Sequence, residues 1–269
     1  MKTPIFLLLT IFLLGGCGKG DTGILGLSSE EKSSIRQEIS TINSNLQLNE
    51  INSNTVQQQI VSRQTACVKM TGLLARSLGA EKSEVSLLLS SMNLDDDQCD
   101  TVYQQNAVCC SYLVKMLALA ARNAGTTTES TAQVSDLMAL DEARTETVFQ
   151  QIALRLNGAF EMSVLLAEAL GTDSEQISKE RSSLSIGELS CETVQQQIAL
   201  RLRYCVVMLG HSAEAAGTES SKVSAVKADV TLRELSAKTV FQQMAIRSEA
   251  VKDMLEAATK TLIELGRTV

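Results

Sequence analysis

The sequence predicts an all-α fold, an α-solenoid-like stack of five two-helix repeats, each 46 residues long. The single Pro among 269 residues is Pro4, and aromatic residues make up 3%, so the chain lacks the residues on which most turns and β-sheets depend. A Thr-Val pair recurs every 46 residues, without insertion or deletion, and so marks the repeats. The five repeats begin at Thr55, Thr101, Thr147, Thr193 and Thr239. The alternative is a helical bundle that folds back on itself.

Each repeat opens with a long helix that has signals at both ends. The Thr is followed three residues later by Gln, the spacing of a capping box in which both residues satisfy helix-end amides. In the first four repeats a Gly stands 24 residues after the Thr, where a left-handed residue ends a helix. The long helix is therefore about 23 residues, or roughly 35 Å. Its apolar residues cover so much of its circumference that it should be buried on more than one side.

A shorter and more polar helix fills the rest of each repeat. We expect these helices near residues 82–94, 128–140, 174–186 and 220–232, each ending in an aliphatic residue seven positions before the next Thr. Residues 28–48 carry apolar side chains at helical spacing and should form a lone helix that caps the N-terminal end of the stack. Terminal units of a repeat stack are expected to differ in this way, because they cover its exposed core.

Residues 1–16 have the pattern of a signal peptide. Lys2 is followed by a ten-residue apolar run, residues 5–14, broken only by Thr10. This run is too short to span a bilayer, which needs about 20 residues, and it fits the apolar core of a signal peptide. It ends in Leu14-Gly15-Gly16-Cys17.

This ending resembles the lipobox of bacterial lipoproteins, although an ordinary secretory peptide is the alternative. The resemblance implies cleavage before Cys17 and a lipid anchor on Cys17, with diacylglycerol on its thiol and palmitate among its acyl chains. Gly18 after the Cys, in place of Asp, implies transport to the outer membrane. The expected organisation is a signal peptide (1–16), a lipidated Cys with a flexible tether (17–27) and a helical-repeat domain (28–269), in the bacterial cell envelope.

Composition argues against several kinds of function. The net charge of −7 gives no electrostatic footprint for nucleic acid. A single His, His211 in the fourth long helix, leaves little room for His-based catalysis or a His metal site, and we expect it in a core or groove. The chain also lacks a Gly-rich phosphate loop and a Cys-x-x-Cys metal motif. We therefore predict a protein that is not an enzyme and has no cofactor and no metal.

Four long helices carry Arg eight residues after the Thr, and Cys109 takes this place in the second repeat. The four are Arg63, Arg155, Arg201 and Arg247. One interpretation is a row of Arg that binds acidic groups on a partner. The other is a structural ladder between stacked repeats, in which Arg pairs with carbonyl groups or with acids near helix starts, such as Glu146. Recurrence in nearly every repeat favours the structural interpretation.

Six Cys besides Cys17 would face an oxidising compartment, where disulfides are expected. Distance along the helix prevents Cys191 from pairing with Cys205, which lies twelve residues inside the same helix. Cys67 and Cys110 lie at similar heights in adjacent long helices. They are the candidate disulfide.

Most of the aromatic residues of the predicted mature chain lie at two positions of the repeat, two and eleven residues after the Thr. They are the candidate partner surface, with buried filler as the alternative: Tyr103, Phe149, Phe241, Tyr112 and Tyr204. The sequence thus predicts a membrane-anchored, non-catalytic binding or scaffolding module for a protein or peptide that lies along one face of the stack. A self-associating structural protein of the cell envelope is the alternative.

Overall fold

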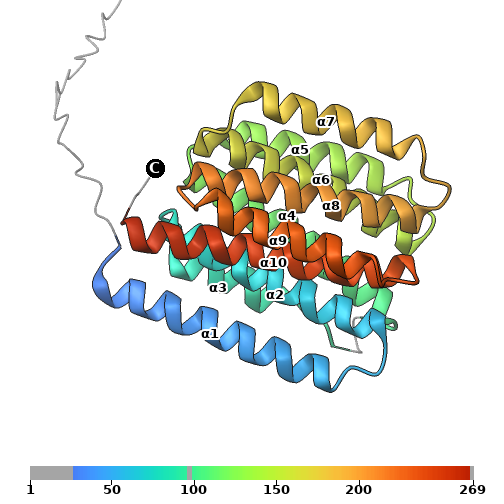
Figure 1. Ribbon diagram of the computed structural model, residues 1–269, viewed down its shortest axis with the longest axis horizontal. Helices are drawn as coiled ribbons and strands as arrows, with labels where there is room; N and C mark the ends of the chain where they lie inside the picture. The colour runs from blue at the N-terminus through green and yellow to red at the C-terminus, as the bar shows by residue number, and fades with distance from the viewer. Residues whose placement is uncertain (1–26, 96–98, 267–269) are drawn as a thin grey trace, which may run out of the picture.

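The computed structural model describes residues 27–95 and 99–266, and all regular structure within them is helical (Figure 1). The long helix of each repeat, its inner helix, is one of α2 (Val56–Ser77), α4 (Val102–Asn123), α6 (Val148–Leu170), α8 (Val194–Ala215) and α10 (Val240–Leu265). The outer helices are α1 (Ser29–Ile51), α3 (Lys82–Ser91), α5 (Thr128–Glu142), α7 (Ser174–Glu188) and α9 (Ser220–Glu234). The predicted all-α fold of two-helix repeats is confirmed. The predicted signal peptide and Cys17 lie outside the described residues.

The predicted ends of the inner helices are also confirmed, whereas α3 ends three residues earlier than predicted and α5, α7 and α9 each end two residues later. Every inner helix begins after its Thr with a complete capping box. The Thr147 hydroxyl accepts from the Gln150 amide at 3.2 Å, and the Gln150 side-chain oxygen accepts from the Thr147 amide at 2.9 Å. At the other end, Gly171 has a φ of +97°, which a residue with a Cβ rarely adopts. The repeat therefore fixes the length of its own inner helix.

The five inner helices form a closed ring. Each packs against the next in sequence order, as a stack of repeats predicts, and α10 also packs against α2. The surface that would be the concave face of an open stack is consequently the core, filled by side chains such as Ile152, Leu156 and Met162. The sequence did not distinguish a closed stack from an open one. Closure is the feature that the folded-back alternative anticipated.

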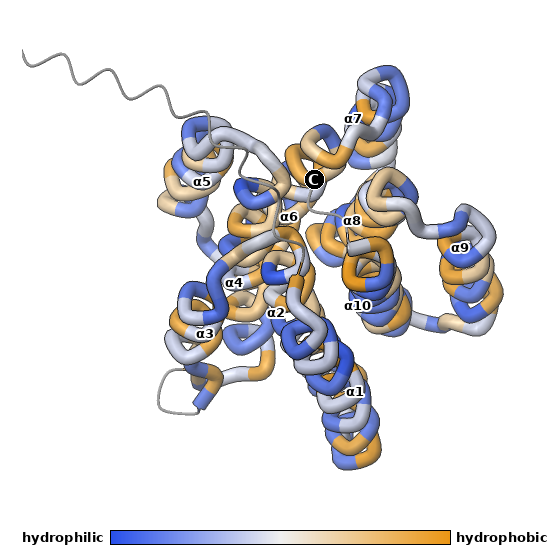
Figure 2. The backbone as a smooth tube through the Cα atoms, turned by 90° about the vertical axis from the view of Figure 1, so that its left-hand side faces the viewer, coloured by the Kyte–Doolittle hydropathy of each residue, from blue (hydrophilic) through white to orange (hydrophobic). Residues whose placement is uncertain are grey.

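The outer helices cover the ring from outside, in the order α1, α3, α5, α7 and α9 (Figure 2). Helix α3 contacts α2 and α4 equally, whereas α5, α7 and α9 each pack mainly on the inner helix that follows them. Helix α1 packs on α2 and also touches α10, so it covers the place where the ring closes.

All five inner helices point the same way, because each is joined to the next by one outer helix that runs back (Figure 1). The Thr residues therefore lie at one end of the ring, the N-cap end, and the Gly residues lie at the other, the Gly end. The first described residue, Leu27, lies at the Gly end, where it lines a cleft with Gly79 and Ala80.

Arginine side chains connect neighbouring repeats through two contacts, one with a backbone carbonyl and one with a Glu, which we call the Arg clasp. The Arg201 guanidinium donates to the Ala153 carbonyl of α6 at 2.5 Å and pairs with Glu188 of α7 at 2.6 Å. The same two contacts recur for Arg155, with Ala107 and Glu142, and for Arg247, with Ala199 and Glu234. The predicted structural ladder is confirmed for the carbonyl partners. The expected acid partner was wrong, because each Glu comes from the end of an outer helix rather than from a helix start.

The clasp changes in two places. At the closing seam, Arg63 pairs with Glu50 at 2.5 Å and with Glu249 of α10 at 3.1 Å. Between α2 and α4, the Cys109 thiol lies 3.4 Å from the Thr65 hydroxyl in place of a guanidinium clasp. Repeat two is thus the one that lacks an Arg clasp among the described residues.

Replacing Arg201 by Ala should lower the free energy of unfolding by about 2 kcal/mol, because a buried carbonyl and a carboxylate lose a charged hydrogen-bond partner. Arg144 is the matched control, since its side chain is 81% exposed and pairs only with Asp141, three residues away. Arg144→Ala should cost at most about 0.5 kcal/mol. Urea unfolding followed by circular dichroism measures both. Equal losses would contradict the clasp.

Candidate functional site

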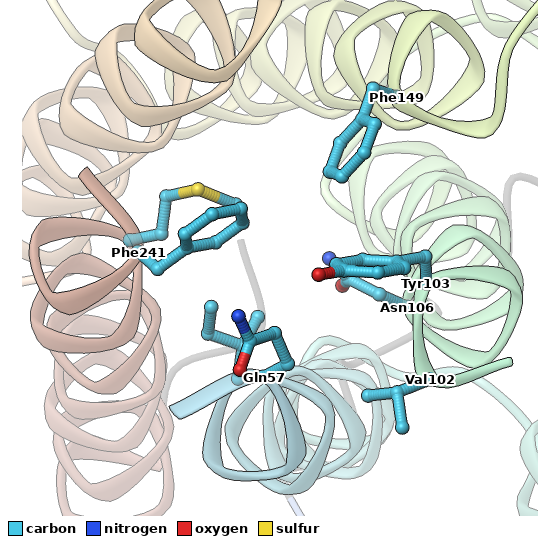
Figure 3. A pocket seen from close by; sticks show the side chains of 8 residues that line it. Gln57, Val102, Tyr103, Asn106, Phe149 and Phe241 are labelled. Carbon is cyan, nitrogen blue, oxygen red and sulfur yellow. The ribbon is translucent and has the colours of Figure 1, made fainter. Parts of the chain in front are cut away.

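The N-cap end of the ring is closed by aromatic side chains. Tyr103, Phe149 and Phe241, from the position two residues after the Thr, meet at the ring axis (Figure 3). Their ring centroids lie 4.8 Å apart for Tyr103–Phe149, and 6.4 and 6.3 Å from Phe241 to the other two. The space among them and Gln57 holds only about 10 Å³, about one water molecule. These half-buried side chains therefore form a plug rather than the entrance to a binding cavity.

The other two predicted partner residues lie elsewhere. The Tyr112 hydroxyl donates to the Ser91 carbonyl at the end of α3 at 2.6 Å. Tyr204 stands edge-on to Phe160, with ring centroids 6.4 Å apart. The candidate partner surface thus divides into an axial set of three aromatics and two tyrosines away from it.

A second group of side chains shares the N-cap end with the plug. At positions seven and four before the Thr, the last turns of the outer helices expose aliphatic side chains, with exposed fractions of 57–88%. We call them the apolar crown: Leu48, Ile51, Leu140, Ile186, Leu189, Leu232 and Leu235. The remaining exposed large aliphatics among the described residues are scattered: Leu87, Leu137 and Leu265. Such a concentration at one end of a fold is typical of an interaction surface.

The crown is uneven around the ring. Helices α1, α7 and α9, which are consecutive in the outer layer, each carry an exposed pair, and α5 contributes only Leu140. Ahead of repeat two, α3 ends earlier, at Ser91, and Leu94 is half-buried. The apolar sector of the N-cap end therefore lies over α7, α9 and α1.

Exposed acids occupy the opposite sector. In the loops and helix ends between crown and Thr, the exposed acidic residues are Asp95, Asp100, Asp141, Glu146 and Glu192. The exposed basic residues there are Arg144 and Lys238. Five acidic and two basic side chains give the exposed, described residues of this end a net charge of −3. Four of the five acids lie at the end of α5 or in the connections from α3 to α4 and from α5 to α6. The N-cap end thus has an apolar sector, an aromatic centre and an acidic sector.

The remaining candidates for chemistry are buried and separate. Cys67 donates to the Ser248 carbonyl at 3.2 Å, and Cys110 to the Asn106 side-chain oxygen at 3.7 Å, so the structure holds the candidate disulfide as two thiols. Burial raises the pKa of both thiols. His211 lies in the groove between α7 and α8, 3.0 Å from the Gln176 amide nitrogen, and burial lowers its pKa. The His is thus a groove residue, as expected.

No group of three or more His, Cys, Asp and Glu side chains in residues 27–95 and 99–266 is placed to hold a metal ion. None of the described helices combines the length and hydropathy needed to cross a membrane.

No family model, curated protein or solved structure matches this chain.

The crown is the feature that the sequence analysis missed. Aliphatic residues seven before the Thr were expected as helix ends, but their partners four before the Thr, such as Leu189 and Leu235, were not singled out. The signal was there: an aliphatic pair three residues apart, at the end of an otherwise polar helix.

In the native protein, an alkylating reagent should modify Cys191 well before Cys205. Cys191 is only partly buried, whereas Cys205 is fully buried and its pKa is raised to about 12, so it offers neither access nor thiolate. Peptide mass spectrometry at pH 8 measures the order. Unfolding without reductant should then expose Cys67 and Cys110 together. If they resist alkylation until reductant is added, they form the disulfide that the sequence suggested.

Proposed function

We propose that this chain is a lipid-anchored protein of the bacterial cell envelope and acts as a non-catalytic binding or scaffolding module for a protein or peptide. The observation that supports a binding role is the apolar crown, because seven of the ten exposed large aliphatic side chains among the described residues lie at one end of the fold. Leaving such side chains in water costs about 25 cal/mol per Å² of apolar surface. A partner that covers them would recover this free energy.

The interior supports the non-catalytic part of the proposal. The recurring Arg side chains, which could have bound a substrate anion, are instead occupied by carbonyl and carboxylate groups of neighbouring repeats. The axis is filled by apolar side chains and closed by the aromatic plug. We therefore expect the binding surface on the outside of the ring.

The position of the chain's start favours the N-cap end as the partner surface. Leu27 lies at the Gly end, and residues 17–27 could span at most about 35 Å fully extended. An anchor on Cys17 would therefore attach to the Gly end of the ring, through a tether of at most this length. The crown would then lie at the end of the ring to which the tether is not attached.

Replacing Cys17 by Ser should release the protein from the membrane fraction, because the acyl chains that anchor it stably would be lost. Cell fractionation with immunoblotting measures the distribution, and intact-mass analysis of the wild-type protein should show the added lipid. The matched control is Cys191→Ser, which removes a thiol far from the anchor and should leave the distribution unchanged. A Cys17→Ser protein that stays membrane-bound and a wild-type protein without lipid mass would contradict the anchor.

A photo-crosslinking residue at Leu189 or Leu235 of the full-length protein should give a discrete adduct in envelopes of the source cells. The same residue at Leu87, which is 69% exposed but lies outside the crown, should give none. An adduct with a different polypeptide supports the binding module. An adduct of two copies, together with a dimer by light scattering, would replace it by the self-associating alternative, and no adduct at either crown position would contradict both.

A further inference from the structure

The N-cap end presents different chemistry on its two sides, and this asymmetry indicates the kind of partner that it fits. On one side stand three consecutive aliphatic pairs, on α7, α9 and α1. On the other stand exposed carboxylates, including Asp95, Asp100 and Glu146, beside Asp141, which pairs with Arg144 at 3.7 Å. Between them lie the faces and edges of Tyr103, Phe149 and Phe241. A ligand that lies across this end would meet an apolar sector, aromatic rings and an acidic sector in turn.

We propose that the N-cap end binds a basic amphipathic helix of a partner protein, a proposal that rests on the binding function proposed above. The apolar face of the helix covers the crown pairs, and its Lys or Arg face pairs with the acidic sector. Helix packing distances of about 10 Å make the end on the order of 35 Å wide, which a helix of about 23 residues crosses. The aromatic centre accepts either aliphatic groups or a guanidinium over a ring face.

Charge complementarity selects this occupant over the two others that an apolar end could attract. A second copy would bring a face of the same described charge, −3, against the first. An anionic membrane surface would likewise be repelled, since negatively charged lipid attracts basic segments rather than acidic ones. A basic helix gains from both sectors, because complementary potentials strengthen and orient an interface.

Two synthetic 23-residue amphipathic helices serve as probes, with one Leu pattern and either Lys or Glu on the polar face. Binding of each fluorescently labelled peptide to the full-length protein in detergent is measured by anisotropy. We expect the Lys peptide to bind about tenfold more tightly than the Glu peptide, a ratio that corresponds to about 1.4 kcal/mol. This ratio should shrink as salt is added, because exposed charges are screened.

Matched variants locate the site on the protein. Leu189→Asn with Leu235→Asn should weaken Lys-peptide binding about tenfold, as expected when central apolar contacts are lost, whereas Leu87→Asn should leave it unchanged. Asp141→Asn with Glu146→Gln should weaken it about fivefold through lost charge pairing. Asp136→Asn with Glu175→Gln is the control, because it removes the same charge from exposed positions on α5 and α7 outside the crown. Circular dichroism and thermal unfolding confirm that each variant folds.

Each result decides the proposal. Equal affinity for the two peptides, or equal losses in the crown and control variants, overturns it. So does a dimer seen by light scattering that Leu189→Asn with Leu235→Asn dissolves, or binding to anionic vesicles that the same variant abolishes. Failure here would differ from failure of the proposed function: a crown that crosslinks to another polypeptide yet shows no preference for the Lys peptide keeps the binding module and rejects the basic helix.

Discussion

The contact between α10 and α2 is the constraint on which the rest of the structure depends. Because the last inner helix contacts the first, every inner helix packs against two inner helices and at least one outer helix. The apolar residues around its circumference are thereby buried. Among the described residues, side chains fill the space that would be the concave, ligand-binding surface of an open repeat stack. The ends of the ring and its outer grooves are the surfaces that remain open to solvent.

Polar contacts join α10 to α2 and α1 where the ring closes. Gln64 of α2 donates to the Ser248 hydroxyl of α10 at 3.0 Å, and both residues are buried. Arg63 pairs with Glu249 across the same seam, and Lys252 of α10 donates to Asn43 of α1 at 3.0 Å. Buried polar groups left unpaired are costly, so these contacts favour one register of α10 against α2 and α1 over any slipped one.

Much of the repeat unit was predictable from the sequence. The Thr-x-x-Gln boxes and the Gly residues are local signals, and they gave the inner helix ends because capping depends on a few neighbouring residues. Closure was not predictable, because it depends on the rotation between successive repeats, which must add up to one full turn over five of them. The 46-residue period places the aromatic residues at one position of the repeat. Only closure of the ring brings Tyr103, Phe149 and Phe241 to one axis.

The crown and the clasp are connected through helix geometry. Ahead of repeats one, four and five, the Glu of the clasp lies five residues before the Thr. It therefore stands between the two crown positions, which lie seven and four residues before the Thr. Because successive helical residues turn by about 100°, the crown pair shares one face and this Glu lies on another. Pairing with Arg201 draws Glu188 inward and so turns Ile186 and Leu189 outward.

Repeat two supports this connection. It has Cys109 in place of the Arg, and ahead of it α3 ends at Ser91 and Leu94 is half-buried rather than exposed. The interaction that fastens the repeats together therefore also orients the surface that we propose for the partner.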